Sequence, residues 1–400
     1  MFSLAVFKDA DAVKIFSGQA ISQICDKMMT VGLVWIIASL GSLRMVPWFL
    51  AAAALPHLLF SRQAAKWIGK LGALKTVVAA DAARALVYAA AWAAWAAWPK
   101  MEVLFCVAFL ANCASALFNP AIMSLPAGLP RSKDGLLGQL TAMIDSCFSL
   151  GNIAGPVAAA LLYPRLGLGG LFLANAASYL LAALLESRID IASAPSPQEL
   201  PSAAAADEAN PRVPFKQDGL VRFLLAAFFL MNMAFTPILA FLPLFAKYRF
   251  AGGIGTLSAM ETSLGLGMAG GSLVLSLLRA HGKTGARLIA SLFSISLMYL
   301  LFALNRSPLL ACAALLALGA ALSVLNVTLL TLFQARPLEQ DVPAVMGWVN
   351  LISVGAVPVS MAFMGGLVES ADLGALALAC ACALLALAGM TSLYPEVRNA

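Results

Sequence analysis

The sequence has little charge and very few histidines. Only 11% of its 400 residues are Asp, Glu, Lys or Arg, 62% are hydrophobic, and there are two histidines. A soluble domain is about a quarter charged and about half apolar, so this composition excludes an ordinary soluble protein and predicts an integral membrane protein. The net charge of +6 needs no nucleic acid to explain it. The lipid bilayer is the partner that this composition requires.

The chain also lacks the residue patterns of common catalytic and metal sites. Its seven cysteines lie inside apolar runs, and none forms a CxxC motif or a Cys/His cluster, so we expect free thiols and no metal site. No phosphate-binding loop of the G-x-x-x-x-G-K-[S/T] type occurs, which argues against direct drive by ATP. No catalytic triad is present. The sequence therefore predicts neither an enzyme nor a cofactor.

What the sequence has instead is a series of long apolar segments rich in glycine and alanine. They lack the alternating ten-residue strands of a membrane barrel and predict transmembrane helices. The predicted fold class is an all-α membrane protein with twelve spans. The spans are residues 15–39, 46–66, 73–98, 101–123, 136–162, 166–186, 220–246, 254–279, 285–304, 308–333, 343–368 and 373–393.

A polar segment divides the predicted spans into two groups of six. Residues 187–219 are rich in Pro, Ala and Ser, which is typical of a linker. The chain is therefore predicted to contain an N-terminal six-helix bundle, residues 1–186, a cytoplasmic linker, and a C-terminal six-helix bundle, residues 220–400.

The two groups of spans carry similar motifs at equivalent places. The loops after the second and the eighth span both contain the sequence G-K-x-G-A, and Asn119 in the fourth span matches Asn326 in the tenth. The Gly-x-x-x-Gly-Pro element of the fifth span corresponds to Gly355–Pro358 in the eleventh span. Three such matches in the same order indicate a duplicated six-helix unit. The residues of the loop and Gly-Pro motifs are Gly69, Lys70, Gly72, Gly151, Gly155, Pro156, Gly282, Lys283 and Gly285.

Lysine and arginine are distributed unevenly over the predicted loops. With both termini placed in the cytoplasm, seventeen of the 25 basic residues fall in inner segments and six in outer segments, while Lys27 and Arg84 lie inside spans. Loops rich in Lys and Arg remain on the cytoplasmic side. We therefore expect a multi-pass protein with both termini in the cytoplasm.

The most unusual feature is a polar face on the first span. Gln19, Gln23, Asp26 and Thr30 recur at helical spacing and lie on one side of a helix. If the helix begins near Ile15, Asp26 lies roughly 16 Å along it, near the centre of a hydrocarbon core about 30 Å thick. A carboxylate is costly there and indicates a functional site.

Two further acidic residues lie well inside predicted spans. Asp145 is roughly 14 Å into the fifth span, and Glu261 is about 10 Å into the eighth. A carboxyl group in apolar surroundings binds a proton more readily than it does in water, as a proton-driven transporter requires. Asp26, Asp145 and Glu261 are therefore candidate proton-coupling or substrate-binding residues. Lys27 is a fourth candidate. It points roughly 100° away from Asp26, so its ammonium can pair with Asp145 or Glu261 instead.

A structural role remains an alternative for these groups. Asp26 can be held by hydrogen bonds from a neighbouring helix or be ion-paired with Arg84. Asp81 and Arg84 are three residues apart near the inner end of the third span, where they can pair with each other. We expect that pair to stabilise the structure rather than to act in coupling.

The chain resembles the transporters of the major facilitator superfamily, and within it the bacterial branch of siderophore exporters and macrolide efflux pumps. The resemblance covers nearly the whole chain outside the linker. Its motif residues are Gly18, Gln19, Ser22, Gln23, Asp26, Asp81, Arg84, Asn119, Pro120, Gly151, Gly155, Pro156, Asn175, Ala176, Ser178, Gln334 and Arg336. One departure is Gly69, which takes the place of the acidic residue that this family usually has in the loop between spans 2 and 3; Lys70 and Gly72 remain.

The resemblance implies a major facilitator fold in a bacterial cytoplasmic (inner) membrane. It also implies that spans 1, 4, 7 and 10 line a cavity, and that the Gly-Pro element of the fifth span favours export. The polar residues expected on the cavity faces are Gln19, Gln23, Thr30, Asn112, Asn119, Asn152, Asn232 and Asn326. Pro237 and Pro243 are predicted to break the seventh span and to act as a hinge.

The sequence thus predicts a monomeric, proton-coupled exporter of amphipathic small molecules, drug-like or siderophore-like, that works by alternating access. An apolar cavity with few polar anchors suits bulky amphipathic ligands. It suits a lipid or lysophospholipid flippase on the same fold equally well, and that alternative stays open. A non-transporting membrane sensor or assembly partner is a second alternative, which the Gly-Pro element and the three buried acids disfavour.

Overall fold

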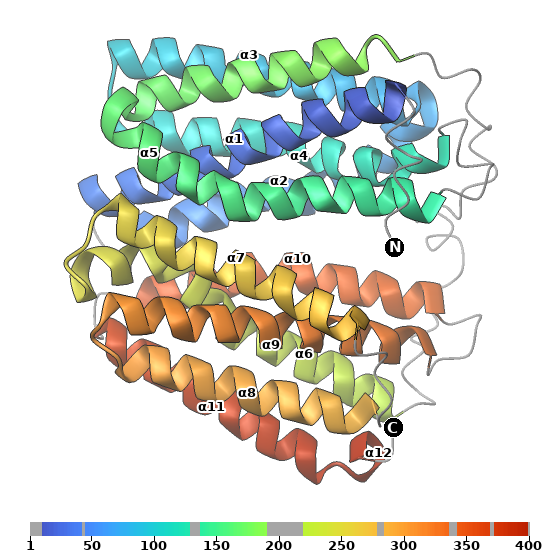
Figure 1. The fold of residues 1–400 in the computed structure, drawn as a ribbon, viewed down its shortest axis with the longest axis vertical. Helices are drawn as coiled ribbons and strands as arrows, with labels where there is room; N and C mark the ends of the chain where they lie inside the picture. The colour runs from blue at the N-terminus through green and yellow to red at the C-terminus, as the bar shows by residue number, and fades with distance from the viewer. Residues whose placement is uncertain are drawn as a thin grey trace. The chain divides into compact units, whose positions relative to one another are not determined.

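The computed structural model consists of long α-helices that lie side by side within each unit of the chain (Figure 1). It describes residues 10–41, 45–128, 137–189, 219–277, 284–335, 342–368 and 372–398, and these ranges contain no β-strand. The helices are α1 (Ala10–Leu40), α2 (Met45–Leu71), α3 (Ala73–Ala97), α4 (Met101–Gly128), α5 (Leu137–Glu186), α6 (Gly219–Leu244), the π-helix η5 (Phe245–Arg249), α7 (Ile254–Leu277), α8 (Thr284–Leu304), α9 (Pro308–Ala335), α10 (Val342–Leu367), α11 (Leu373–Leu393) and α12 (Pro395–Arg398). The predicted all-α class is confirmed.

Each predicted span coincides with a helix, but several helices extend beyond the apolar run. Helix α2, predicted to end at residue 66, continues to Leu71, and Lys66 and Lys70 are exposed on this extension. Helix α4, predicted to end at residue 123, continues to Gly128. Hydropathy marks the part of a helix that suits hydrocarbon, whereas backbone hydrogen bonds carry the helix on into polar surroundings. The short helix α12 was not predicted.

Nine of the described helices are long and apolar enough to cross a membrane. Helix α2 has only a shorter apolar stretch, Met45–Phe60. Helix α7 is not among the nine, and its first turns carry the polar residues Thr256, Ser258 and Glu261. Several apolar helices in one chain make this a multi-pass membrane protein.

The outward faces of these helices are also apolar. Leu86, Leu309 and Leu393 are 72%, 78% and 79% exposed, and many other leucines are similarly placed. Isolated apolar residues are common on soluble surfaces, but apolar side chains along most of the outward faces are typical of contact with lipid tails.

Helix α5 contains two predicted spans joined at Gly167. The backbone of Gly167 has φ 60° and ψ −175°, and the chain is helical on both sides of it. A positive φ costs glycine little because glycine has no Cβ. The predicted change of span between residues 162 and 166 therefore lies just before the observed break.

The prediction that Pro237 and Pro243 break the seventh span is wrong. Helix α6 runs from Gly219 to Leu244 through both prolines. The π-helix η5 follows directly, at Phe245–Arg249. Membrane helices tolerate proline where local π adjustments give the freed backbone groups new partners, and η5 is such an adjustment.

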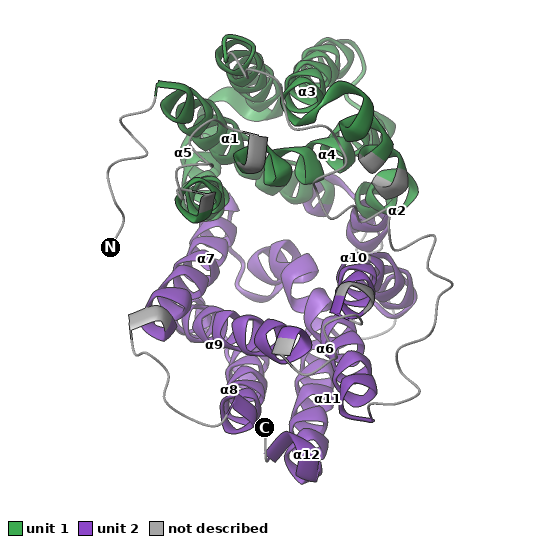
Figure 2. Ribbon diagram, turned by 90° about the vertical axis from the view of Figure 1, so that its right-hand side faces the viewer, with its two compact units in different colours: residues 1–37, 52–204 green, residues 38–51, 205–400 purple. Residues whose placement is uncertain are grey.

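The helices form two compact units, residues 1–37 with 52–204 and residues 38–51 with 205–400 (Figure 2). In unit 1, α3 packs against α4 and α5. In unit 2, α9 packs against α7 and α8, and α11 packs against α6 and α8. Residues 190–218, which hold most of the predicted linker, lie outside the described residues.

Glycines allow α7 and α9 to approach very closely inside unit 2. A Cβ added to Gly267 would meet the carbonyl oxygen of Leu316, and one added to Gly271 would meet the backbone of Ala320. Gly319 of α9 faces the backbone of α7 in the same way. Small residues at such positions let membrane helices pack backbone against backbone.

Candidate functional site

Two glycines bring α5 directly against α1 in unit 1. A Cβ added to Gly151 would lie 2.8 Å from the carbonyl oxygen of Gln23, and one added to Gly155 would lie 2.6 Å from the Cβ of Lys27. These distances are well below normal van der Waals separation, so a larger side chain would push the helices apart. The Gly-x-x-x-Gly element therefore permits a close approach of the two helices. Its counterpart Gly355 has open space around it within the described part of the chain.

The polar face of α1 runs from the interior of unit 1 to its surface. Gln19 and Gln23 are buried, Asp26 is half-buried, and Thr30 is exposed. The Thr30 hydroxyl donates to the backbone carbonyl of Asp26 at 3.0 Å. The structure thus confirms that these residues share one side of the helix, and it places the two glutamines inside the unit.

The side-chain amide of Gln19 connects three helices. Its Nε2 donates to Asp81 Oδ2 on α3 at 3.2 Å and to Glu186 Oε1 at the end of α5 at 2.6 Å. Its Oε1 accepts from Gln23 Nε2 at 3.4 Å. One amide therefore brings two carboxyl groups together, although these lie more than a hundred residues apart in the chain.

Arg84 is the cation of this cluster. Its guanidinium pairs with Asp81, as the i, i+3 spacing predicted. It also donates to the hydroxyl of Tyr179 at 3.2 Å and lies over the ring of Phe118, 3.9 Å from the centroid. A buried guanidinium needs such partners because it has lost its water.

Tyr179 links Arg84 to Asp26. Its hydroxyl donates to Asp26 Oδ1 at 2.6 Å, and its ring stacks on Tyr88 with centroids 5.9 Å apart. Asp26 is therefore held by a hydrogen bond from a neighbouring helix and is joined to Arg84 through one hydroxyl group. The sequence left two alternatives for Asp26, a hydrogen bond from a neighbouring helix and an ion pair with Arg84. The hydrogen bond is present, and the link to Arg84 runs through the Tyr179 hydroxyl.

The result is a continuous buried polar cluster that contains more acid than base. Its carboxyl groups are those of Asp26, Asp81 and Glu186, and its only guanidinium is that of Arg84. Asp81, Arg84 and Glu186 are 0%, 2% and 0% exposed. Buried charges must be paired or neutralised, so an excess of buried acid favours proton binding. We name these residues, together with Gln19 and Tyr179, the carboxyl cluster.

Tyr179 and Glu186 were not among the candidate residues predicted from the sequence. Glu186 is the last residue of the predicted span 166–186. Asn175, Tyr179, Ala182 and Glu186 follow one another at i, i+4, i+7 and i+11, which puts them on one helix face. That periodicity could have identified Tyr179 and Glu186 as members of one polar helix face. It does not show which other helices this face contacts.

Asp145 lies outside the carboxyl cluster. Asp145, Ser149 and Asn152 are all exposed, so they share an accessible face of α5, as their spacing predicted. Lys27 is half-buried, and its aliphatic stem packs against Gly155.

Asn112 of α4 pairs with a histidine that the sequence gave no reason to select. Its Oδ1 lies 3.1 Å from Nε2 of His57 on α2, and its amide also donates to the carbonyl of Ala108 at 2.8 Å. Asn119 and its counterpart Asn326 are both exposed. The two matched asparagines thus occupy similar environments in the two units.

In unit 2 the candidate polar residues are mostly engaged with their own helix. Asn232 donates to the carbonyl of Phe228 at 2.8 Å, and Thr236 donates to the carbonyl of Asn232 at 2.6 Å. Glu261 is half-buried on α7.

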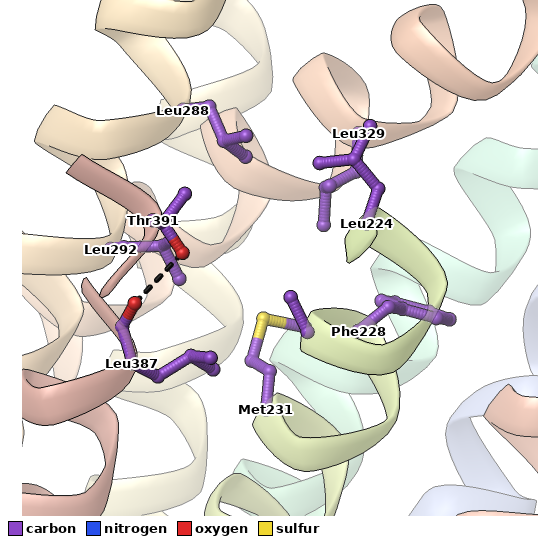
Figure 3. A pocket seen from close by; sticks show the side chains of 9 residues that line it. Leu224, Phe228, Met231, Leu288, Leu292, Leu329, Leu387 and Thr391 are labelled. Atoms are coloured by element: carbon purple, nitrogen blue, oxygen red, sulfur yellow. Dashed lines mark hydrogen bonds between the residues drawn. The ribbon is translucent and has the colours of Figure 1, made fainter. Parts of the chain in front are cut away.

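A small cavity of about 10 Å³ lies between α6, α8, α9 and α11. Figure 3 shows leucines, Phe228 and Met231 around it, with Thr391 as the only polar residue. The Thr391 hydroxyl is already bonded to the carbonyl of Leu387 at 2.8 Å. The space is about that of one water molecule and offers no free polar partner, so it is a packing gap rather than a substrate site.

The residues of the repeated loop motif are only partly described. Gly69 and Lys70 are exposed at the end of α2, and Gly72 takes φ 84° just before α3. Such a φ favours glycine at this position. Gly285 is buried in the first turn of α8, while Gly282 and Lys283 lie outside the described residues. Within the described ranges, no three His, Cys, Asp or Glu side chains gather as a metal site would require.

A family model, described as "Major Facilitator Superfamily", matches residues 15–361 of the chain. A search of curated proteins gave no match.

Solved structures resemble the chain over nearly its whole length. An auto-inhibited peptide transporter of the POT family has a TM-score of 0.73 at 11% identity, covering 97% of both chains. The nucleoside transporter NupG has 0.73 at 14% identity, covering 96% of this chain and 99% of its own. The E. coli fucose:proton symporter FucP has 0.57 at 14% identity, covering 96% and 98%. At these identities the likeness concerns the fold.

Proposed function

Because the chain belongs to the Major Facilitator Superfamily, we propose that it is a secondary active transporter that exports amphipathic small molecules in exchange for protons. The substrates are drug-like or siderophore-like, and the mechanism is alternating access. The protein acts as a monomer in the inner membrane of a bacterium, with both termini in the cytoplasm. The excess of Lys and Arg in the inner loops supports this orientation.

The observation that carries the proposal is the setting of Asp26. Its carboxyl group is half-buried in an apolar helix and accepts a hydrogen bond from Tyr179, which in turn accepts one from Arg84. A carboxyl group that is neither free in water nor locked in a direct ion pair can gain and lose a proton as its surroundings change. Binding of a cationic or polar substrate at the same group would displace that proton, so each ligand would disfavour the other at a shared site.

Two further observations support the direction and the coupling ion. The close approach of α1 to α5 at Gly151 and Gly155 is the geometry expected of the Gly-Pro element, and the same element in the resembling exporters is associated with export. One of the structures with this fold is a fucose:proton symporter, so the fold accommodates proton-coupled transport.

The test uses the full chain reconstituted in lipid vesicles with an imposed pH gradient. Three probes represent the proposed classes: ethidium, a macrolide and a catechol siderophore. We expect pH-driven movement of at least one probe by the wild-type protein and its loss in Asp26→Asn, because the amide cannot exchange a proton. Glu102→Gln is the matched control, since Glu102 is an exposed acid in the first turn of α4.

Two results would contradict the proposal. One is a wild-type protein that moves none of the three probes in response to pH. The other is a folded Asp26→Asn variant with normal proton-linked transport. Scrambling of labelled phospholipid in place of probe movement would support the flippase alternative.

A further inference from the structure

The carboxyl groups of Asp81 and Glu186 meet inside unit 1, away from Asp26. We propose that they form a second proton-binding site, in which one proton is shared between the two groups at the end of α5. This site does not depend on the role of Asp26, and it stands whether or not the protein exports amphipathic molecules.

The geometry of the pair favours a bound proton. Gln19 Nε2 donates to Asp81 Oδ2 and to Glu186 Oε1, at 3.2 Å and 2.6 Å, so one amide group holds the two carboxyl groups side by side. Both acidic side chains are 0% exposed, and the guanidinium of Arg84 pairs with Asp81. Two ionised carboxylates in such a buried site repel each other, so we expect one of them to be the neutral acid.

The hydrogen-bond pattern identifies Glu186 as the acid. Asp81 Oδ1 is occupied by the guanidinium of Arg84, which stabilises the ionised form of Asp81. Glu186 Oε2 is buried and receives no hydrogen bond from any described residue. An ionised Glu186 would therefore leave a charged, buried oxygen without a partner, which costs more than the neutral acid does.

The surrounding charges lead to the same assignment. On α3 the charged group beside the pair is Arg84, the partner of Asp81, and on α5 the thiol of Cys147 lies close to Glu186. Cys147 is a hydrogen-bond donor to backbone carbonyls and so remains neutral.

On α1, Lys14 lies near the same end of α5. Its ammonium pairs with Asp11 at 2.8 Å and donates to the carbonyl of Arg188, just beyond the end of α5. Arg84 thus pairs with Asp81, and an ionised Glu186 would be a second buried negative charge whose direct hydrogen-bond donor is the Gln19 amide. That state is much costlier than the neutral acid.

The pair is placed to respond to movement between helices. Asp81 is on α3, Glu186 ends α5, and Gln19 reaches both from α1. Separation of any one of these helices would break the Gln19 bridge and admit water to Glu186. The proton would then leave as the carboxylate becomes solvated, which couples helix packing in unit 1 to protonation.

The test is infrared spectroscopy of the purified full chain in lipid nanodiscs at neutral pH. A protonated carboxyl group has a carbonyl stretching band that a carboxylate lacks. We expect the difference spectrum of wild type minus Glu186→Gln to contain this band, and the spectrum of wild type minus Glu102→Gln to lack it. Exchange into heavy water should shift the band.

The folding of the variants provides a second measurement. Glu186→Gln keeps the size and the neutral charge of the protonated acid, and its amide oxygen can accept the same hydrogen bond from Gln19, so its melting temperature should equal that of the wild type. A missing band, a band that persists in Glu186→Gln, or an unfolded Glu186→Gln would each overturn the proposal. A present band in a protein that moves none of the transport probes would leave this site standing and would remove the proposed function.

Discussion

The interiors of the two units differ in chemistry although both are made of packed apolar helices. In unit 1 the buried polar side chains include an arginine, two carboxyl groups and three amides. In unit 2 every buried polar side chain among the described residues is a serine or threonine. The residues are Ser258, Ser291, Ser296, Ser323, Thr328, Ser360 and Thr391.

The buried polar side chains of the two units make different contacts. The hydroxyls of Ser296 and Thr391 donate to the carbonyl four residues earlier on their own helix. Ser360 donates to the carbonyl of Met233 on α6, and Ser323 pairs with Ser272 of α7, so unit 2 has contacts between helices that are uncharged. In unit 1 the side chains of Gln19, Arg84 and Tyr179 bond to carboxyl groups on other helices or on their own. Unit 2 also packs closely through glycine. A repeat duplicated in sequence can thus keep its helices while the fully buried charged side chains of the described residues lie in one copy.

The largest effect should come from removing the buried anion of unit 1. Asp81→Asn leaves the guanidinium of Arg84 buried without its counter-ion, and we expect a loss of about 3–5 kcal/mol of stability. Thermal unfolding in nanodiscs measures this, with Glu102→Gln as the exposed-acid control. Unchanged melting of Asp81→Asn would show that the ion pair does not support unit 1.

A smaller effect should follow from cutting the link between Asp26 and Arg84. Tyr179→Phe keeps the ring that stacks on Tyr88 but removes the hydroxyl, which should cost about 1.5–3 kcal/mol. In a double-mutant cycle with Asp26→Asn, the two changes should be non-additive. Tyr163→Phe, at a half-buried tyrosine of α5, is the control. Strict additivity would mean that the two side chains act independently.

In unit 2 the sensitive positions should be glycines rather than polar residues. Gly267→Ala inserts a methyl group against the carbonyl of Leu316 and should destabilise the protein by about 1–3 kcal/mol. Gly270→Ala, three residues along the same helix, meets no described atom within 4 Å and should be neutral or slightly stabilising, since alanine favours helix by about 1 kcal/mol. The reverse order would refute close packing of α7 on α9.

The smallest effect should come from a buried hydroxyl of unit 2. Ser296 is 2% exposed, yet its hydroxyl bonds only to the carbonyl of Leu292 at 2.7 Å. That carbonyl also accepts a backbone hydrogen bond within the same helix, so it keeps a partner when the hydroxyl is removed. Ser296→Ala should therefore change stability by less than about 1 kcal/mol. A loss comparable to that of Asp81→Asn would erase the contrast between the two units.

Local patterns in the sequence were sufficient for some of the site. The i, i+3 spacing of Asp81 and Arg84 predicted their ion pair, and the helical spacing of Gln19, Gln23, Asp26 and Thr30 predicted the polar side of α1. Both are properties of a single helix face. The meeting of His57 with Asn112 was not predicted, because it depends on how α2 and α4 rotate against each other.

Length, hydropathy and helical periodicity are local quantities, and from them alone followed the membrane class, the helix order and the candidate residue Asp26. The partner of Asp26, Tyr179, lies 153 positions along the chain, and Gln19 meets Asp81 and Glu186 at separations of 62 and 167 positions. Such meetings follow from how closely α1, α3 and α5 pack, which glycines at the helix contacts allow. The tertiary structure therefore decided which carboxyl groups share their surroundings.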